Sequence, residues 1–455
     1  MLPRRPPARA VLGALAVCAL APRAAAAGTP AEGAGPVPPW LVGPFVGLLA
    51  AIALLPLLAP RWWGKNYALL SLAFGAFVVA WYLLVRGEAE PLAHRGLEYV
   101  SFISLIGSLY VASGGILVRV SRRGTPVVNT VLLLLGAFLA NVFGTTGASA
   151  LLIRPFLRIN RGHVRPYHVV FFIFLVSNCG GALTPIGDPP LFMGFIKGIG
   201  FWWVAEHGYG VWATVVLGLL ATFFSIDAYH AWKRPGPEPP VGRTAVEFVG
   251  IGNFLWIFVI LGAVFLIVPL GFGIPELIMV TAAALAHRTT PRSVLSDNEF
   301  DFHPIREVAI LFAGIFATMI PALQYLETHA REFGLASPAS YYFKTGVLSS
   351  VLDNTPTYLS FLTVAAGQLG LSLDRPEDVA AFVAAQPRVL LAISMGAVFF
   401  GACTYIGNGP NFMVKSIAER AGVPCPSFLG YVAKYAVPFL LPWLALAWAL
   451  FFRGA

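Results

Sequence analysis

The segment at residues 184–193, TPIGDPPLFM, returns 220 positions later at 404–413 as TYIGNGPNFM, and a Gly-Ala pair precedes each copy. Both copies place helix-breaking Gly and Pro, with an Asp or an Asn, inside an otherwise apolar run. In hydrocarbon, a broken backbone is tolerated only where it is buried in protein or lines a polar cavity. A matched pair of interrupted helices is typical of the substrate site of a secondary transporter.

The composition places this chain in a membrane. Of its 455 residues, 58% are hydrophobic and only 11% are charged, whereas soluble domains have about 25% charged residues. The net charge of +9 does not indicate nucleic-acid binding, because the Lys and Arg residues lie in short loops between apolar runs and form no basic stripe with interleaved aromatics. The lipid bilayer is therefore the expected partner, and nucleic acid is excluded.

A membrane-spanning helix needs about 20 apolar residues. Residues 1–27 resemble a secretory signal, with three arginines before an apolar run and three alanines at 25–27 as a small-residue cleavage site. The alternative is a short first helix that is retained. The other apolar runs that reach or approach the spanning length are 40–59, 66–85, 98–118, 209–231, 247–268, 274–287, 307–326 and 428–451.

Two further apolar segments turn back on themselves. Segment 127–159 turns at 144–147 and has basic residues at both ends, which predicts a re-entrant hairpin that enters and leaves on the cytoplasmic side. Segment 341–369 turns at 353–356 without strongly basic flanks, and we expect a hairpin that enters from outside. The two copies of the repeated pattern lie in two broken helices, 167–203 and 388–422.

Each half of the chain thus has outer helices, a hairpin, a broken helix and a closing helix, with the two hairpins in opposite orientations. The predicted fold is an all-α polytopic membrane protein built as an inverted-topology repeat, with two re-entrant hairpins and two broken helices. The predicted organisation is a signal peptide at 1–27, an external tail at 28–39, a first half at 40–231, a cytoplasmic linker at 232–246 and a second half at 247–455.

The distribution of basic residues predicts the orientation. Loops with an excess of Lys and Arg are expected in the cytoplasm. If the mature N-terminus lies outside, the cytoplasmic loops are basic and the external loops mix basic residues with acids, as at 86–90. We therefore expect a multi-pass protein of the inner membrane, with the mature N-terminus and the C-terminus in the periplasm.

Each half offers two irregular elements that are expected to meet near the middle of the membrane, namely the tip of its hairpin and the break in its helix. Such elements supply carbonyl and hydroxyl oxygens to a cation, or free N–H groups to an anion. Small oxygen donors dominate here, which suits a hard ion such as sodium rather than zinc or copper. The predicted ion- and substrate-binding residues are Thr145, Thr146, Asn178, Thr184, Gly187, Asp188, Asp353, Asn354, Thr355, Thr404, Gly407 and Asn408.

Asp188 and Asp353 are the predicted centre of this site, with sodium expected at Asp188, Asp353 and Asn354. An ionisable residue at membrane depth is costly unless it is paired or hydrated, so a functional role is the first hypothesis. A carboxyl group in a poorly solvated cavity favours its protonated form, and it can then bind a proton and a cation in alternation. The alternative is that each Asp caps the helix that follows it. Asn408 occupies the repeat position of Asp188 and is neutral, so the two halves are chemically unequal.

Three stretches, Thr146–Pro155, Asn178–Pro190 and Asp353–Thr357, resemble the ion transporter superfamily. This superfamily includes sodium/proton antiporters of the NhaD type, arsenite permeases, citrate–metal symporters and divalent anion/sodium symporters. Over most of residues 40–451, the chain is most similar to the bacterial branch labelled sodium:proton antiporter or citrate transporter. The resemblance implies a homodimer, a scaffold domain, and a transport domain that holds the hairpins and broken helices and moves like an elevator.

The dicarboxylate branch of this superfamily has Ser-Asn-Thr at both hairpin tips. Here the tips at 144–147 and 353–355 read Gly-Thr-Thr-Gly and Asp-Asn-Thr, so the carboxylate-binding signature is incomplete, and the acidic Asp353 disfavours an anion further. Sodium/proton antiport is the leading hypothesis, with Na⁺ and H⁺ as transported ions and no cofactor. The alternatives are sodium- or proton-coupled uptake of an organic anion such as citrate, and a channel. An intramembrane enzyme is disfavoured, because the sequence shows no nucleophile–base pair or metal cluster at membrane depth.

Overall fold

The computed structural model describes residues 37–120, 124–233 and 246–453. The predicted signal peptide, most of the external tail and most of the cytoplasmic linker lie outside these residues. Within the described residues, eight helical segments are long and apolar enough to cross a membrane, and a bent pair at 376–403 brings the number to nine if it counts as one span. The eight segments are Pro39–Leu58, Pro60–Arg86, Glu90–Gly114, Pro126–Ile159, Trp203–Trp232, Gly252–Leu270, His303–Thr328 and Phe428–Phe451. The prediction of an all-α polytopic membrane protein is confirmed.

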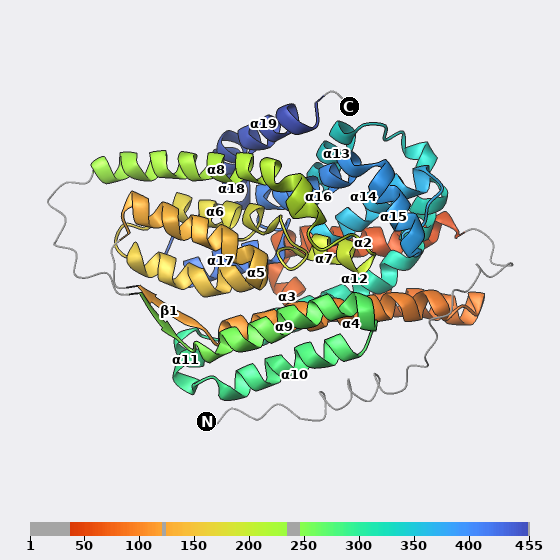
Figure 1. Ribbon diagram of the computed structural model, residues 1–455, viewed down its shortest axis with the longest axis horizontal. Coiled ribbons are helices and arrows are strands. Elements are labelled where there is room, and N and C mark those ends of the chain that lie inside the picture. Colours follow the sequence, from red (N-terminus) through yellow and green to blue (C-terminus); the bar gives the residue numbers. More distant parts are fainter. Residues whose placement is uncertain (1–36, 121–123, 234–245, 454–455) are drawn as a thin grey trace.

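One group of helices, which we call the scaffold unit, contains most of the outer helices of both halves (Figure 1). Its two halves are joined by buried contacts, since Ser71 Oγ donates to the Ile310 carbonyl at 3.0 Å and the rings of Phe102 and Phe312 stack with centroids 4.7 Å apart. The members of the scaffold unit are η1 (Pro39–Val42), α2 (Gly43–Leu58), α3 (Pro60–Trp81), η2 (Tyr82–Arg86), α4 (Glu90–Gly114), α9 (Gly252–Leu270), α10 (Ile274–Thr289), α11 (Arg292–Asp297) and α12 (His303–Thr328).

The remaining helices form a second group, the site unit, which contains both hairpins and both broken helices. It lies against the scaffold unit mainly through α14 on α12 and through α5 and α7 on α4. The members of the site unit are α5 (Pro126–Ile159), α6 (Pro166–Leu175), η3 (Cys179–Gly181), α7 (Pro189–Ile196), α8 (Trp203–Trp232), η4 (Ala330–Phe333), α13 (Pro338–Val351), α14 (Asn354–Gln368), α15 (Pro376–Ala385), α16 (Pro387–Phe400), η5 (Gly401–Cys403), α17 (Gly409–Arg420), α18 (Phe428–Tyr431), η6 (Val432–Leu440) and α19 (Leu441–Phe451).

The first hairpin is α5, which reverses direction at Gly144. The φ angle of Gly144 is 74°, a conformation that Gly adopts without steric cost. Asn129 near the start of α5 and Asn160 directly after its end exchange two side-chain hydrogen bonds, of 2.9 and 2.8 Å. The two ends of this 34-residue helix therefore lie side by side, as a re-entrant hairpin requires.

The second hairpin consists of α13 and α14, joined by Leu352 and Asp353. Its open end is closed by Tyr341, whose hydroxyl donates to Gln368 Oε1 at 2.8 Å. In Figure 1, α5 lies toward one end of the molecule and α13 and α14 lie toward the other, with α7 between them. The two hairpins therefore approach the centre from opposite ends, as the predicted inverted repeat requires.

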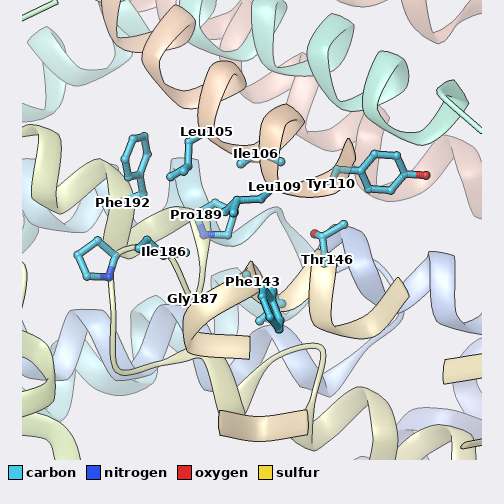
Figure 2. Close-up of a pocket in the computed structure, with 14 residues that line it drawn as sticks. Leu105, Ile106, Leu109, Tyr110, Phe143, Thr146, Ile186, Gly187, Pro189 and Phe192 are labelled. Atoms are coloured by element: carbon cyan, nitrogen blue, oxygen red, sulfur yellow. The ribbon is translucent and has the colours of Figure 1, made fainter. Parts of the chain in front are cut away.

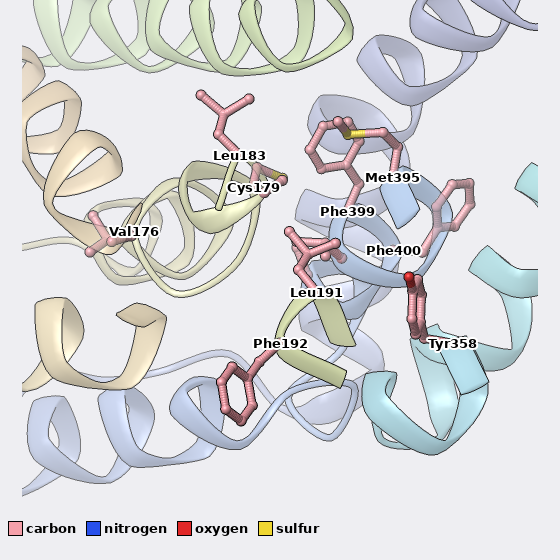
Figure 3. Close-up of a cluster of buried hydrophobic side chains, with 14 of the residues drawn as sticks. Val176, Cys179, Leu183, Leu191, Phe192, Tyr358, Met395, Phe399 and Phe400 are labelled. Carbon is pink, nitrogen blue, oxygen red and sulfur yellow. The ribbon is translucent and has the colours of Figure 1, made fainter. Parts of the chain in front are cut away.

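Each broken helix consists of two short helices separated by a 3₁₀ turn and an irregular loop of turns and bends. The first is α6, η3 and α7, and the second is α16, η5 and α17. Figure 3 shows apolar side chains of both broken helices, including Leu191, Phe399 and Phe400, gathered near Tyr358 of the second hairpin. This buried cluster holds the irregular loops inside protein, where irregular backbone is tolerated at membrane depth.

One element was not predicted from the sequence. Strand β1 (Leu117–Val120), which follows α4, pairs antiparallel with β2 (Val246–Val249), which precedes α9. The predicted spans at 98–118 and 247–268 extended into these strands, whereas α4 ends at Gly114 and α9 begins at Gly252. The side chain of Asn298 donates to the carbonyls of Gly114 and Ile116, which fixes β1 to the scaffold unit.

Candidate functional site

Asp188 lies at the first helix break, directly before α7. It occupies the N-cap position, but its side chain makes no capping hydrogen bond to that helix. Its carboxylate accepts instead from Thr145 Oγ1 at 2.8 Å, from Asn354 Nδ2 at 2.5 Å and from Asn408 Nδ2 at 3.0 Å. The capping alternative therefore does not describe Asp188.

These three donors come from three separate elements. Thr145 lies at the tip of the first hairpin, Asn354 begins the second arm of the second hairpin, and Asn408 lies in the second helix break. Asp188 itself belongs to the first break. The four irregular elements that the sequence predicts thus meet at one carboxyl group.

The groups that donate hydrogen bonds to Asp188 are neutral. Its side chain is completely buried, with 0% exposure, and the three groups that donate to it have no formal charge. Among the described residues, no Lys, Arg or His forms an ion pair with Asp188. A buried carboxylate without a positive partner is strongly unfavourable, so this group requires either a proton or a bound cation.

The donors to Asp188 differ in whether they can also accept a hydrogen bond from it. The amide of Asn408 also donates to the Ser177 carbonyl at 3.1 Å, and since a carbonyl can only accept, this amide is fixed as a donor to Asp188. The hydroxyl of Thr145 can rotate and either donate or accept. Thr145 can therefore serve the charged carboxylate as a donor and the protonated carboxyl as an acceptor.

The repeated Thr and Gly residues build the breaks themselves. In the first half, Thr184 Oγ1 donates to the Asn141 carbonyl at 2.6 Å and accepts from the Gly187 amide at 3.1 Å. In the second half, Thr404 donates in the same way to a carbonyl of its own hairpin at 2.6 Å and accepts from the Gly407 amide at 3.1 Å. The threonine of each copy therefore fastens its helix break to the first arm of the hairpin in the same half.

The glycines of the repeat allow two backbone segments to touch. An ideal Cβ at Gly187 would lie 2.0 Å from the Gly181 carbonyl oxygen, and one at Gly407 would lie 2.6 Å from the Gly401 carbonyl oxygen. Both distances are far below van der Waals contact, so no side chain fits at either position. The predicted site residues Thr184, Gly187, Thr404 and Gly407 thus shape the site without contacting Asp188 through their side chains.

Asn178 links the two halves instead of contacting Asp188. Its amide donates to the Ile173 carbonyl at 2.8 Å and to Asn411 Oδ1 at 2.7 Å, which is the interhelical role common for Asn in membrane bundles. Asn141, which the sequence analysis missed, accepts from the Leu183 amide at 2.9 Å and donates to the Gly180 carbonyl at 2.7 Å. An Asn within the apolar stretch of α5 was the available signal for this residue.

Asp353 behaves differently from Asp188. Its side chain caps α14 by accepting from the Thr355 amide at 3.0 Å, so the capping alternative describes Asp353. The Thr355 hydroxyl lies 3.5 Å from Asn354 Oδ1, at the edge of hydrogen-bonding distance. Asp353 and Thr355 therefore hold the hairpin tip that presents Asn354 to Asp188.

A small cavity lies beside Asp188, between the first hairpin tip, the first break and α4 (Figure 2). Its volume is about 30 Å³, which is the size of a water molecule or a bare ion. Thr146 and Gly187 are among the residues that line the cavity with polar atoms. Leu105 and Phe192 are among the residues that form its apolar walls. The predicted residue Thr146 thus faces this cavity and not the carboxylate.

The chain matches a known transporter family over nearly its whole length. The family described as "Putative citrate transport" matches residues 34–452. Two curated relatives, from Mycobacterium bovis and Mycobacterium tuberculosis, are each called an uncharacterized transporter. Each is 26% identical to this chain over 341 residues, and the matched region covers 69% of this chain and 74% of the relative. With eight or more apolar helices among its described residues and two hairpins that meet at a buried carboxyl group, the chain is a multi-pass membrane protein that belongs to this family.

Proposed function

We propose that this chain is a secondary active transporter that exchanges sodium for protons, with Asp188 binding the two ions in turn. The observation that carries the proposal is the completely buried Asp188 carboxyl group, which receives three hydrogen bonds from neutral groups. Because the charge on this group must be compensated by either a proton or a cation, binding of one excludes binding of the other. Mutual exclusion at one group is the simplest physical basis of exchange.

The geometry favours a small cation over an anion. Asn354 and Asn408 direct their donors at Asp188 itself, so these groups are already engaged by the protein's own negative charge. The cavity of about 30 Å³ beside Thr146 can hold an ion or a water molecule. Sodium, which prefers hydroxyl, carbonyl and carboxylate oxygens, is the ion that these groups suit.

Asp353 enters the proposal at the second hairpin tip. It directly precedes Asn354, which contacts Asp188, and its backbone position is fixed by the cap of α14. We propose that Asp353 contributes a second negative charge that attracts the cation to the site, while Asp188 exchanges the proton. Thr145 would then change its hydroxyl direction as Asp188 gains or loses that proton.

Coupled uptake of an organic anion such as citrate is the second candidate. The observation that favours it is the description of the family to which the chain belongs. In this reading, the sodium or proton held at Asp188 is a coupling ion, and the anion binds at a site that opens in another conformation.

Purified protein in proteoliposomes separates the two candidates. A pH gradient is set across the vesicle membrane, and sodium is then added with and without citrate. Antiport predicts that sodium alone dissipates the gradient. Labelled citrate that accumulates inside the vesicles, with no response to sodium alone, would overturn the antiport proposal in favour of anion uptake.

The variant Asp188→Asn tests the residue that carries the proposal. Asn cannot take up or release a proton at this position, so we expect a folded protein in which sodium no longer dissipates the pH gradient. Asp378→Asn is the matched control, because Asp378 lies in α15 and its carboxylate accepts from the Ser372 amide, away from the site. Full antiport in the Asp188→Asn protein would contradict the assignment.

A further inference from the structure

Four charged side chains form a closed ring at one end of the boundary between the scaffold unit and the site unit. Around the ring, Arg95 Nη1 contacts Glu98 Oε2 at 2.8 Å, Glu98 Oε1 contacts Lys197 Nζ at 2.7 Å, Lys197 Nζ contacts Asp374 Oδ1 at 2.5 Å, and Asp374 Oδ1 contacts Arg95 Nη2 at 3.1 Å. The charges alternate around this charge ring and sum to zero.

The charge ring crosses the boundary between the two units. Arg95 and Glu98 lie on α4 of the scaffold unit, Lys197 directly follows α7, and Asp374 lies between α14 and α15. Two of its four contacts, Glu98 to Lys197 and Asp374 to Arg95, therefore join one unit to the other. Together with the packing of α5 and α7 on α4, these two contacts hold the site unit that contains Asp188 against the scaffold unit.

The ring is buried enough for these contacts to be strong. The side chains of Arg95, Glu98 and Lys197 are 10%, 5% and 3% exposed, and only Asp374 is well exposed, at 46%. Burial alone would raise the pKa of Asp374, but the positive charges of Arg95 and Lys197 outweigh it and hold this pKa below its usual range. The carboxylate therefore keeps its charge, and separating a buried pair leaves charges without partners at a high cost in free energy.

At the opposite end of the boundary, the contacts that the structure gives between described residues are longer, and one of them joins Arg158 Nη2 to the Asp297 carbonyl at 3.5 Å. There, Arg154 of the first hairpin lies 3.5 Å from Glu299, whose side chain is 69% exposed. An exposed pair at this distance contributes little to stability. Among these contacts, the ones in the charge ring are therefore the shorter and more deeply buried.

A metal ion is the competing explanation for this cluster. Ligand atoms of His94, Glu98 and Asp374 all lie within 4.8 Å of one another, beside a cavity of about 240 Å³. However, Arg95 and Lys197 already compensate both carboxylates at hydrogen-bonding distance. A divalent ion would have to displace a buried lysine, so the contacts favour an ion-pair ring.

We propose that the charge ring is a lock that holds the site unit against α4 in the observed conformation and that must open when the site unit moves. This proposal rests on the proposed transport function, since a transporter has to expose its site to each side of the membrane in turn. Opening the ring separates Lys197 and Asp374 from Arg95 and Glu98. The strength of the ring then sets how often the boundary opens.

The test measures opening of the boundary without measuring transport. Leu105, two turns along α4 from Glu98, is 2% exposed and faces the first hairpin tip across the boundary. In a background with Cys18→Ser and Cys425→Ser, the thiol of Leu105→Cys reacts with a maleimide only when the two units separate. The reaction is followed by mass spectrometry on purified protein in detergent, with and without Asp374→Asn, a change on an exposed loop that should preserve folding.

We expect Asp374→Asn to accelerate labelling of the Leu105→Cys thiol by about tenfold or more, because the ion pair between Asp374 and Arg95, one of the two that cross the boundary, is lost and Arg95 is left with one partner fewer. Lys197→Met should accelerate it at least as much. Asp378→Asn, with the same change of chemistry nearby, should leave the rate unchanged. The native buried thiols Cys179 and Cys403 lie inside the site unit and should stay unlabelled in every variant, which shows that the unit itself remains folded.

An unchanged labelling rate in folded Asp374→Asn protein would overturn the lock, and so would equal acceleration by Asp378→Asn. If Lys197→Met fails to fold, the Asp374→Asn result decides alone. The assay contains no sodium gradient and no citrate, so its outcome is independent of the cargo. Failure of antiport in vesicles, together with accelerated labelling, would leave the lock in place and reject only the proposed exchange.

Discussion

At the scale of single residues, Thr145 is the donor to Asp188 that can also act as an acceptor. We predict that Thr145→Val, which keeps the shape and removes the hydroxyl, weakens the apparent sodium affinity by about tenfold or more, since a hydrogen bond to a charged group contributes about 1.5–3 kcal/mol. Thr145→Ser should retain most of the affinity. The measurement is the sodium concentration that gives half-maximal dissipation of a pH gradient. Equal sodium affinities of the Thr145→Val variant and the native protein would refute the role of the Thr145 hydroxyl in sodium binding.

The unequal residues at the repeat position give a second prediction. Asn408→Asp places a carboxyl group within hydrogen-bonding distance of Asp188, and two adjacent carboxylates cannot both be charged without strong repulsion. We expect a lower apparent unfolding temperature for Asn408→Asp in detergent at neutral pH. Adding Asp188→Asn should restore it, because one carboxyl group then remains. A double variant as unstable as the single one would show that repulsion is not the cause.

At the scale of elements, the effect of adding a side chain at the glycine of each helix break can be compared with the same change at Gly409, which begins α17. Gly187→Ala and Gly407→Ala each force a methyl group against a carbonyl oxygen of the same broken helix, so we predict a large loss of folded, monodisperse protein on size-exclusion chromatography. Gly409→Ala is the control, because no atom lies within 4 Å of the added Cβ. Normal yields of the Gly187→Ala protein would mean that the break can widen without cost.

The hairpins and helix breaks could be predicted from the sequence because each is marked locally. Gly144, the basic flanks and the repeated TxIG motif all lie within the elements that they define. What the sequence could not decide depends on distant partners. Asp188 and Asp353 both directly precede a helix, and only the tertiary arrangement shows that the second one caps its helix while the first accepts from both hairpins.

The strand pair and the charge ring escaped prediction for the same reason. Val118 pairs with Phe248, and Arg95 contacts Asp374, and each of these pairs is separated by more than a hundred residues. Nothing near either partner in the sequence marks the other. From the sequence, Asp374 is an ordinary loop charge and Lys197 lies within the predicted broken helix at 167–203, and only the fold brings both to α4.

At the scale of the whole molecule, the orientation in the membrane remains a prediction with a direct test. In a background with Cys18→Ser and Cys425→Ser, the variants Glu332→Cys and Arg292→Cys place one exposed thiol on each side of the predicted bilayer. A membrane-impermeant maleimide added to intact spheroplasts should label the Glu332→Cys thiol, whereas the Arg292→Cys thiol should react only after permeabilisation, because basic loops face the cytoplasm. The reverse pattern would invert the topology and place both described ends inside.

The inequality of Asp188 and Asn408 has a consequence for how such a molecule can be assembled. Two separate half-length chains related by a two-fold axis would have the same residue at both positions, and would bring either two carboxyl groups or none to the centre. A single chain that contains both halves is free of this restriction. Fusion of the two halves into one chain therefore permits a single carboxyl group at the centre, whereas a symmetric dimer of half-length chains can place only an even number of carboxyl groups there.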